Sequence, residues 1–584
     1  MKKILSILTV GCALTLSSCE DWLDKYPLAQ MSPETFFSNE NELQAFSNTF
    51  YTIFPGDGLY NEGYDNIVKN EIAAEMRDGR TIPASGGGWT WTDLRKFNTL
   101  LEYSGNCKDT DIRNRYDAVA RFFRAYFYFE KVKRFGDVPW YAKPLGSADP
   151  ELKRPRDSRE FVMQRMIEDI DFAIRYLPAE RDLYRVTKWT ALALKSRFCL
   201  FEGTFRKYHS IDGYEHDWKW YLEQAADAAE EFITNSGYSL YTATGPATSY
   251  RDLFASENAQ SVEVILARDY NSALGVFHNA NFYTISASYG KPGMTRKIVD
   301  SYLMADGSRF TDKAGWETME FKQQCSNRDP RLAESIVEFG TDFCGVVYDP
   351  RFDVEQVWDS NVGRNITNPD NIVTASESRL PSRTGLVQRK GIDKDWTDDY
   401  QADPDKIIMR YADVLLMYAE AKIELNEIDD ATLEAMNRVR ARAYGVQHTE
   451  TDKYPAIVTR NQSELRTILR TERRMEFAFE RLRIYDLLRW RIAEKVLNYS
   501  DWTIKYNAGA NVLKKVMTDG QWFIPTPAID ESGCPEMDAT FSRENRPHIT
   551  ALYNRVFNPE IHYLWPLPAT DVLVNKNLKQ NYGY

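Results

Sequence analysis

Long stretches of the chain carry an apolar residue at every third or fourth position, which is the spacing of an amphipathic helix. In segment 119–135, five apolar residues fall on one helical face: Val119, Phe122, Tyr126, Phe129 and Val132. Gly136 and Pro139 follow directly, and both residue types commonly end helices. The pattern therefore predicts a helix that ends at Phe135.

Six further segments show the same periodicity. The first of them lies between Ser158, which suits an N-cap, and Pro178, which cannot continue a helix. The six predicted helices are 159–177, 187–197, 218–233, 411–425, 431–443 and 464–496, the last with one expected break. Helix pairs of this kind are typical of tetratricopeptide repeats, which have a period of about 34 residues, although the spacing here is irregular.

The remaining segments, 236–400 and 500–565, contain Gly, Pro and short β-like runs such as 262–266. They are too long to be linkers and too rich in Trp and Tyr to be disordered. We expect them to form a loop-rich second subdomain, built from discontinuous sequence and wrapped around the helical frame. The predicted fold class is predominantly α.

The composition adds one unusual feature to an ordinary globular balance of 43% hydrophobic and 27% charged residues. The net charge of −12 argues against a nucleic-acid partner. A mean hydropathy of −0.52, without an apolar run of about 18 residues, argues against a membrane-spanning protein. The unusual feature is the 14 Trp, 34 Tyr and 30 Phe residues, which either fill a very aromatic core or display rings on the surface.

The first eighteen residues are predicted to be a lipoprotein signal peptide. Lys2 and Lys3 precede an apolar run from Ile4 to Leu16, and small residues lead to Cys19. Residues 16–19 resemble a bacterial lipobox, in which the Cys is diacylated; the alternative is an ordinary signal peptide with a coincidental Cys. The acidic residues at 20 and 21 resemble a signal for export to the outer face of the outer membrane.

The mature chain is expected to be a single domain, residues 19–584, with a net charge of −14 once the two lysines are removed. Its expected parts are 19–235 with helical hairpins, 236–400 as a loop-rich insertion and 401–584 with further hairpins. Five cysteines remain beyond Cys19, scattered and without a C-x-x-C motif. We expect most of them to be buried apolar residues, with a Cys325–Cys344 disulfide as an open alternative.

Several motifs carry a family resemblance over nearly the whole chain. They are CEDWLD at 19–24, RAYFY at 124–128, RFGDVP at 134–139, NRDPR at 327–331, RYADVLLMYAEA at 410–421 and ERRMEF at 472–477. In this order they resemble the SusD/RagB family of outer-membrane nutrient-binding lipoproteins. One departure is segment 480–483, where a Gly is more usual before the Leu/Arg pair.

The resemblance implies four tetratricopeptide-like helical hairpins that form a superhelical frame, with the ligand surface on the loop-rich side. It also implies a partner, a TonB-dependent SusC-type transporter. It names no ligand and calls for no cofactor, and a structural calcium stays an open alternative. Besides the lipid anchor, no contact with the membrane is implied.

The charged residues of the motifs allow two interpretations, catalysis or buried ion pairs that fix the helix packing. They are Arg124, Asp169, Arg410, Asp413, Glu420, Glu476 and Asp486. We favour ion pairs, because the sequence has no H-E-x-x-H, G-x-S-x-G, P-loop or G-x-G-x-x-G motif and its six His residues are dispersed. Segment 327–331 is likewise expected to be a structural turn before a helix, and the protein is predicted not to be an enzyme.

Sugars have apolar faces and hydroxyl edges, so a binding surface should combine rings with planar polar groups. Two segments, 57–98 and 269–316, show this combination. The ligand-binding candidates are Tyr64, Arg77, Asp78, Arg80, Trp89 and Trp91 in the first segment and Asn281, Tyr283, Tyr289 and Trp316 in the second. Trp89 follows three glycines, and we expect it to be exposed and Trp91 to be buried.

The sequence thus favours a cell-surface, lipid-anchored, non-catalytic protein that captures an oligosaccharide or polysaccharide for import. The acidic balance favours a neutral glycan. A peptide- or glycopeptide-capturing subunit of RagB type and a mainly structural transporter lid are the alternatives.

Overall fold

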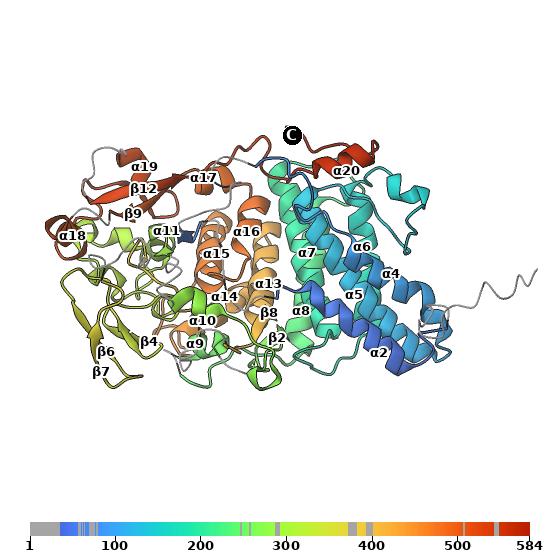
Figure 1. The fold of residues 1–584 in the computed structure, drawn as a ribbon, viewed down its shortest axis with the longest axis horizontal. Coiled ribbons are helices and arrows are strands. Elements are labelled where there is room, and N and C mark those ends of the chain that lie inside the picture. The colour runs from blue at the N-terminus through green and yellow to red at the C-terminus, as the bar shows by residue number, and fades with distance from the viewer. Residues whose placement is uncertain are drawn as a thin grey trace, which may run out of the picture.

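The computed structural model describes residues 35–56, 60, 62, 65–68, 76, 80–245, 248–255, 259–285, 293–371, 382–392, 401–505, 509–541 and 548–584. Helices occupy one end and the middle of the elongated molecule, and the loop-rich part occupies the other end (Figure 1). The fold is predominantly α, as the periodicity predicts. In the described part, no helix is both long and apolar enough to cross a membrane.

The N-terminal half supplies one group of helices. They are α2 (Glu40–Asn48), α4 (Thr92–Tyr103), α5 (Thr110–Phe135), α6 (Arg159–Tyr176), α7 (Lys188–His209) and α8 (Trp218–Asn235). Antiparallel neighbours pack in pairs, α5 with α6 and α7 with α8. The Ser158 side chain caps α6 by accepting from Phe161 N at 3.2 Å, and Gly136, at φ 74°, ends α5. The predicted ends at these two residues are confirmed.

A second group comes from the C-terminal part: α13 (Tyr411–Leu425), α14 (Asp430–Ala443), α15 (Gln462–Glu476), α16 (Arg483–Arg489) and α17 (Ala493–Leu497). Helix α13 packs on both α7 and α8 and so connects the two groups. Segment 464–496 has two breaks, where the sequence predicts one. Phe479, Arg481 and Arg491 have positive φ, which L-residues adopt at a cost, and Arg481 is the position where Gly was expected.

Strands and short helices from several parts of the chain make up the loop-rich end, whereas β2 (Val264–Arg268) and β8 (Lys406–Arg410) lie beside α8 and α13 (Figure 1). The other strands are β1 (Ile67–Val68), β3 (Gly293–Met294), β4 (Thr341–Phe343), β5 (Val346–Tyr348), β6 (Gln356–Asp359), β7 (Arg364–Thr367), β9 (Ser500–Ile504), β10 (Ala528–Ile529), β11 (Pro535–Glu536) and β12 (Ile549–Asn554). All of their pairings are antiparallel; β4 to β7 form one sheet in sequence order, whereas β2 pairs with β8 and β9 with β12.

The short helices are α9 (Ser249–Phe254), α10 (Ala280–Ile285), α11 (Arg296–Ser301), α12 (Arg331–Ser335), α18 (Ala510–Met517), α19 (Met537–Thr540) and α20 (Ala569–Val574). Helices α18 and α19 lie at the loop-rich end, together with strands β4, β6 and β7, whereas α20 lies beside the N-terminal helices (Figure 1). The loop-rich end therefore draws on discontinuous sequence, as expected.

Two hydrophobic cores account for many of the aromatic residues. One core runs through the helices and contains Phe122, Phe129 and Tyr411, with Tyr126 packed at its edge. The other fills the loop-rich end and contains Trp316 and Trp522. Most of the aromatic residues therefore contribute to packing, and only a ring that also lines a cavity is accessible to a ligand.

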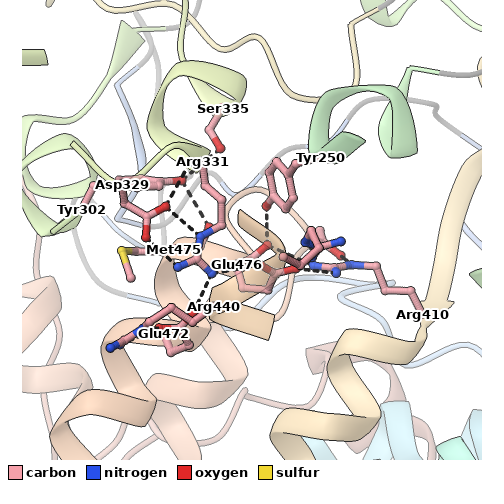
Figure 2. Close-up of polar contacts among 12 residues, drawn as sticks. Tyr250, Tyr302, Asp329, Arg331, Ser335, Arg410, Arg440, Glu472, Met475 and Glu476 are labelled. Carbon is pink, nitrogen blue, oxygen red and sulfur yellow. Dashed lines mark hydrogen bonds and ion pairs between the residues drawn. The ribbon is translucent and has the colours of Figure 1, made fainter. Parts of the chain in front are cut away.

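A buried network of ion pairs joins α15 to three other elements (Figure 2). The carboxylate of Glu476 accepts from Arg331 Nη1 of α12 at 3.0 Å and from Arg410 Nη1 of β8 at 2.7 Å. It also accepts from Arg442 of α14. Burial alone would raise the pKa of Glu476, but the three guanidinium groups hold that pKa well below its usual value.

The other charged motif residues are buried in the same way, and the ion-pair interpretation is confirmed. The pairs are Arg124 with Asp169, Asp413 with Arg197 and Arg473, Glu420 with Arg489, and Asp486 with Arg473 and Arg489. Segment 327–331 is a turn before α12, as expected: Asn327 has φ 55°, and Asp329 accepts from the backbone N–H of Arg331 at 3.0 Å.

None of the five described cysteines, Cys107, Cys199, Cys325, Cys344 and Cys534, is part of a disulfide. The possible Cys325–Cys344 disulfide is therefore not formed. All of them except Cys325, which is half-buried, are buried, in agreement with the apolar role expected from the sequence.

We predict that Glu476→Gln strongly destabilises the protein. The amide leaves three buried guanidinium groups short of a negative charge, and breaking such a pair typically costs about 3–5 kcal/mol. Urea unfolding of both proteins at pH 7 measures the change. Glu450→Gln, which removes an exposed pair with Lys453, serves as the control and should leave the midpoint unchanged. Equal midpoints for wild type and Glu476→Gln would contradict the central role of the network.

Candidate functional site

The two segments that the sequence selects as ligand-binding lie against each other in the fold. Strand β1 of the first segment pairs with β3 of the second, with Ile67 opposite Met294. Thr295 extends the contact, because its backbone N–H donates to Asn66 O at 2.9 Å and its hydroxyl donates to Asp65 O at 2.8 Å. The prediction thus selected two neighbouring parts of the molecule.

Several predicted ligand contacts are not described. Tyr64, Arg77, Asp78 and Tyr289 lie outside the described residues, and Tyr283 belongs to α10 without a described side chain. Asn281, also in α10, is fully buried. The ligand-binding roles of these residues remain predictions.

Arg80 and Trp316 are buried, at 7% and 6% exposure, and their positions explain why. The Arg80 guanidinium lies 3.5 Å from the ring centroid of Trp565 and donates to the carbonyl oxygens of His562 and Leu564. The Trp316 ring packs 4.9 Å from Phe523 in the second core. Both side chains hold the fold together, and neither presents a free face to a ligand.

The expectation that Trp89 is exposed and Trp91 buried is wrong. Trp89 is 6% exposed, and its ring lies edge-to-face with Phe135 at 4.9 Å, whereas Trp91 is half-buried. The three glycines 86–88 all have positive φ, and the Trp89 N–H donates to Gly86 O at 2.8 Å. This tight turn directs Trp89 back onto α5.

Trp91 faces a cavity of about 420 Å³, which we call the Trp91 groove. Its walls come from the start of α4, the segment after α5 and the end of the chain around α20. The apolar lining is Trp89, Trp91, Leu94, Pro139, Tyr141, Pro144, Leu145, Leu152, Val574 and Leu578. The volume lies within the roughly 300–1,000 Å³ of small-molecule sites.

Polar groups at the groove are partly committed to the structure and partly open to solvent. Asn98 is buried and already donates to Tyr141 O at 2.8 Å and accepts from Arg124 at 3.1 Å. Arg95 and Lys143 are exposed, and neither has an ion-pair partner in the described part of the chain. Burial raises the pKa of Asp571 on the opposite wall. The groove thus offers a ring beside two cations.

Lys131 of α5 holds the turn beneath this groove. Its ammonium group donates to Gly88 O at 2.5 Å and lies 5.7 Å from the centroid of the Trp91 ring. Burial lowers its pKa to about 8. The sequence gives no sign of this contact, because Lys131 lies in a helix more than forty residues away.

No feature of a catalytic or metal site is found at these places. The charged motif residues are occupied by ion pairs, and within the described ranges no group of three or more His, Cys, Asp or Glu side chains could hold a metal. A half-exposed ring with exposed cations is suited to binding rather than to proton transfer.

Comparison with known proteins identifies the family. Residues 253–584, more than half of the chain, match the SusD family, and residues 21–200 match a family described as starch-binding associating with outer membrane. The chain belongs to the SusD family.

Two relatives show the extent of the similarity. SusD-like protein P25 of Formosa agariphila is 24% identical over 84% of this chain and 91% of its own length. A SusD-like protein of Bacteroides ovatus is 25% identical over 90% of this chain and 91% of its own.

Solved structures show the same fold. A SusD-like carbohydrate-binding protein of Bacteroides fragilis superposes with a TM-score of 0.70 at 22% identity, covering 94% of this chain and all of that one. A laminarin-binding SusD-like protein superposes with a TM-score of 0.54 at 18% identity, with the same coverage.

We predict that Trp89 contributes more to the stability of the fold than Trp91 does. Trp89→Ala removes a fully packed ring and should lower the free energy of unfolding by about 3–5 kcal/mol, the usual range for Phe or Trp to Ala in a core. Trp91→Ala should lower it clearly less, because part of that ring already faces solvent. Urea denaturation of the two variants provides the comparison. A larger loss in the free energy of unfolding for Trp91→Ala would show that Trp91, and not Trp89, is the core ring.

We also predict a pH dependence from Lys131. Its folded pKa lies below the unfolded value of about 10.5, so between pH 8 and 10.5 the unfolded chain binds more protons than the folded one. Wild-type stability relative to Lys131→Met should therefore rise across this window, by up to about 3 kcal/mol. Urea unfolding of both proteins at pH 7.5 and 10 measures this difference in stability. A difference that is the same at both pH values would show that folding does not lower the pKa of Lys131.

Proposed function

We propose that the protein is a non-catalytic, cell-surface glycan-binding lipoprotein that captures an oligosaccharide and delivers it to a TonB-dependent SusC-type transporter. Membership of the SusD family supports this, as do the carbohydrate-binding and laminarin-binding proteins of the same fold. The lipobox at 16–19 supports a lipid anchor at Cys19, and the acidic residues after it support an exterior position.

The Trp91 groove is the observation that carries the glycan part of the proposal. The part of the half-buried Trp91 ring that faces the groove can pack on the apolar face of a sugar ring, and Tyr141 extends the aromatic wall. The hydroxyl edges of the sugar can accept hydrogen bonds from Arg95 and Lys143. Since neither cation is held by an ion pair in the described structure, binding breaks no internal contact.

The unpaired cations also favour a second candidate. Arg95 and Lys143 would suit the carboxylates of an acidic peptide or glycopeptide, which corresponds to a RagB-type subunit. A neutral glycan agrees better with the net charge of −14 of the mature chain, since that charge repels anions at long range.

The test uses the mature chain without its lipid, residues 20–584, on a glycan array and a peptide library. We expect neutral glycans to bind and Trp91→Ala to weaken them about fivefold, since one aromatic contact contributes about 1 kcal/mol. Phe161→Ala, which removes an exposed ring on α6, is the matched control and should bind like wild type.

Two other results would overturn the proposal. Binding of peptides alone, lost in an Arg95→Gln/Lys143→Gln double variant, would assign the groove to acidic peptides. Binding of neither class would make the protein a structural lid of the transporter.

A further inference from the structure

A second cavity, of about 200 Å³, lies at the loop-rich end, and we call it the Tyr499 cavity. Its walls are α11, β9 and the segment 530–539, with Val68 of β1 and Thr295 at its edge. Figure 1 shows α11, β9 and α19 gathered there, at the opposite end of the molecule from α4 and its Trp91 groove. The two cavities share no lining residue.

Two aromatic side chains line this cavity with their polar ends already fixed. The Tyr499 hydroxyl donates to Asp65 O at 3.1 Å, and Trp502 Nε1 donates to Asp538 Oδ1 at 2.5 Å. Because these bonds anchor the rings, the cavity keeps its shape without a ligand. Lys297 Nζ lies 4.4 Å from the centroid of the Tyr499 ring.

Two buried charged side chains at the cavity have polar atoms that the described residues leave unsatisfied. Arg296, 4% exposed, uses Nη2 for Asp300 at 2.9 Å and for Gln324 Oε1, and its guanidinium carbon lies 5.0 Å from the centroid of the Phe523 ring. Its Nε and Nη1 have no hydrogen-bond partner among the described residues. Asp501, fully buried, uses Oδ1 for Arg555 Nε at 2.8 Å, whereas its Oδ2 has none. Buried polar atoms are nearly always paired, so donors and an acceptor at one cavity indicate a polar guest.

The two buried charged groups at the cavity are already balanced, so a guest that contacts them needs no charge of its own. Arg296 is balanced by Asp300 and Asp501 by Arg555, and Lys495 pairs with Glu531 outside. The other charged lining residues lie nearer to solvent: Lys297 and Asp530 are half-buried, and Glu536 and Asp538 are exposed. A vicinal diol of a sugar ring can donate to a carboxylate oxygen and accept from a guanidinium group at the same time. The volume, below the roughly 300 Å³ of the smallest drug-sized sites, suits one sugar unit rather than a chain.

We infer that the Tyr499 cavity is a separate site for a single neutral sugar unit, oriented by Arg296 and Asp501 against Tyr499 and Trp502. The inference rests on the proposed function in taking a sugar as the ligand class. The site inferred here differs from the Trp91 groove in its location, because recognition of one sugar unit is assigned to the loop-rich end.

The experiment is saturation-transfer NMR of the mature chain with D-glucose, D-galactose, D-mannose and D-xylose at millimolar concentration. Ala539→Trp is the blocking variant, because Ala539 lines the cavity from its exposed side and a larger side chain there need not disturb a core. Ala510→Trp, at an exposed residue of α18 outside the lining, is the matched control. Asp501→Asn keeps one oxygen to accept from Arg555 and replaces Oδ2 by an amide NH₂, which donates instead of accepting; its melting temperature is measured as a check on folding.

We expect at least one of the four sugars to bind wild type and Ala510→Trp equally, and to bind Ala539→Trp at least tenfold more weakly. Trp91→Ala should leave this signal unchanged while it weakens glycans on the array, so that failure of the groove and failure of the cavity can be told apart. Absence of binding by all four sugars, or full binding to Ala539→Trp, would overturn the inference even if the glycan array is positive. Folded Asp501→Asn with unchanged sugar affinity would also overturn it.

Discussion

The convergence of three guanidinium groups on the Glu476 carboxylate is the interaction on which the rest of the structure depends (Figure 2). It ties the end of α15 to α12, β8 and α14, and therefore ties the helical frame to the loop-rich end. Taking these charges out of water is expensive, and only their mutual satisfaction makes the arrangement stable. The network also fixes the turn after α15, whose positive φ at Phe479 and Arg481 must be compensated by contacts elsewhere.

The charged residues of the motifs contribute to the stability of the fold through buried ion pairs. The carboxylates and guanidinium groups of the motifs are engaged in ion pairs inside the frame. The proposed ligand contacts lie instead at the edge of the frame, where Trp91 and Arg95 line a groove at the start of α4.

Helices were predictable from the sequence because their signals are local. Apolar periodicity placed α5 and α13, and the Ser158 cap and Gly136 placed two ends correctly. The exposure of individual rings was not predictable, because it depends on distant contacts. Trp89 is buried by Phe135 of another helix, and the Trp91 groove is closed by Val574 and Leu578 near the end of the chain. Nothing in residues 86–91 indicates those partners, and the polar atoms of the Tyr499 cavity likewise come from residues about two hundred positions apart.

The polar groups of the two cavities differ in their exposure to water, and this difference determines which ligands each cavity can recognise. In the Trp91 groove the cations are exposed, so a wrong ligand leaves them hydrated and loses little. In the Tyr499 cavity Arg296 and Asp501 are buried, so a ligand without matching hydroxyls leaves their atoms unpaired, at a penalty of about 1–3 kcal/mol each. Sites with buried polar groups discriminate far more strongly than open hydrophobic ones. The groove is therefore suited to capture of a chain, and the cavity to selection of a single unit.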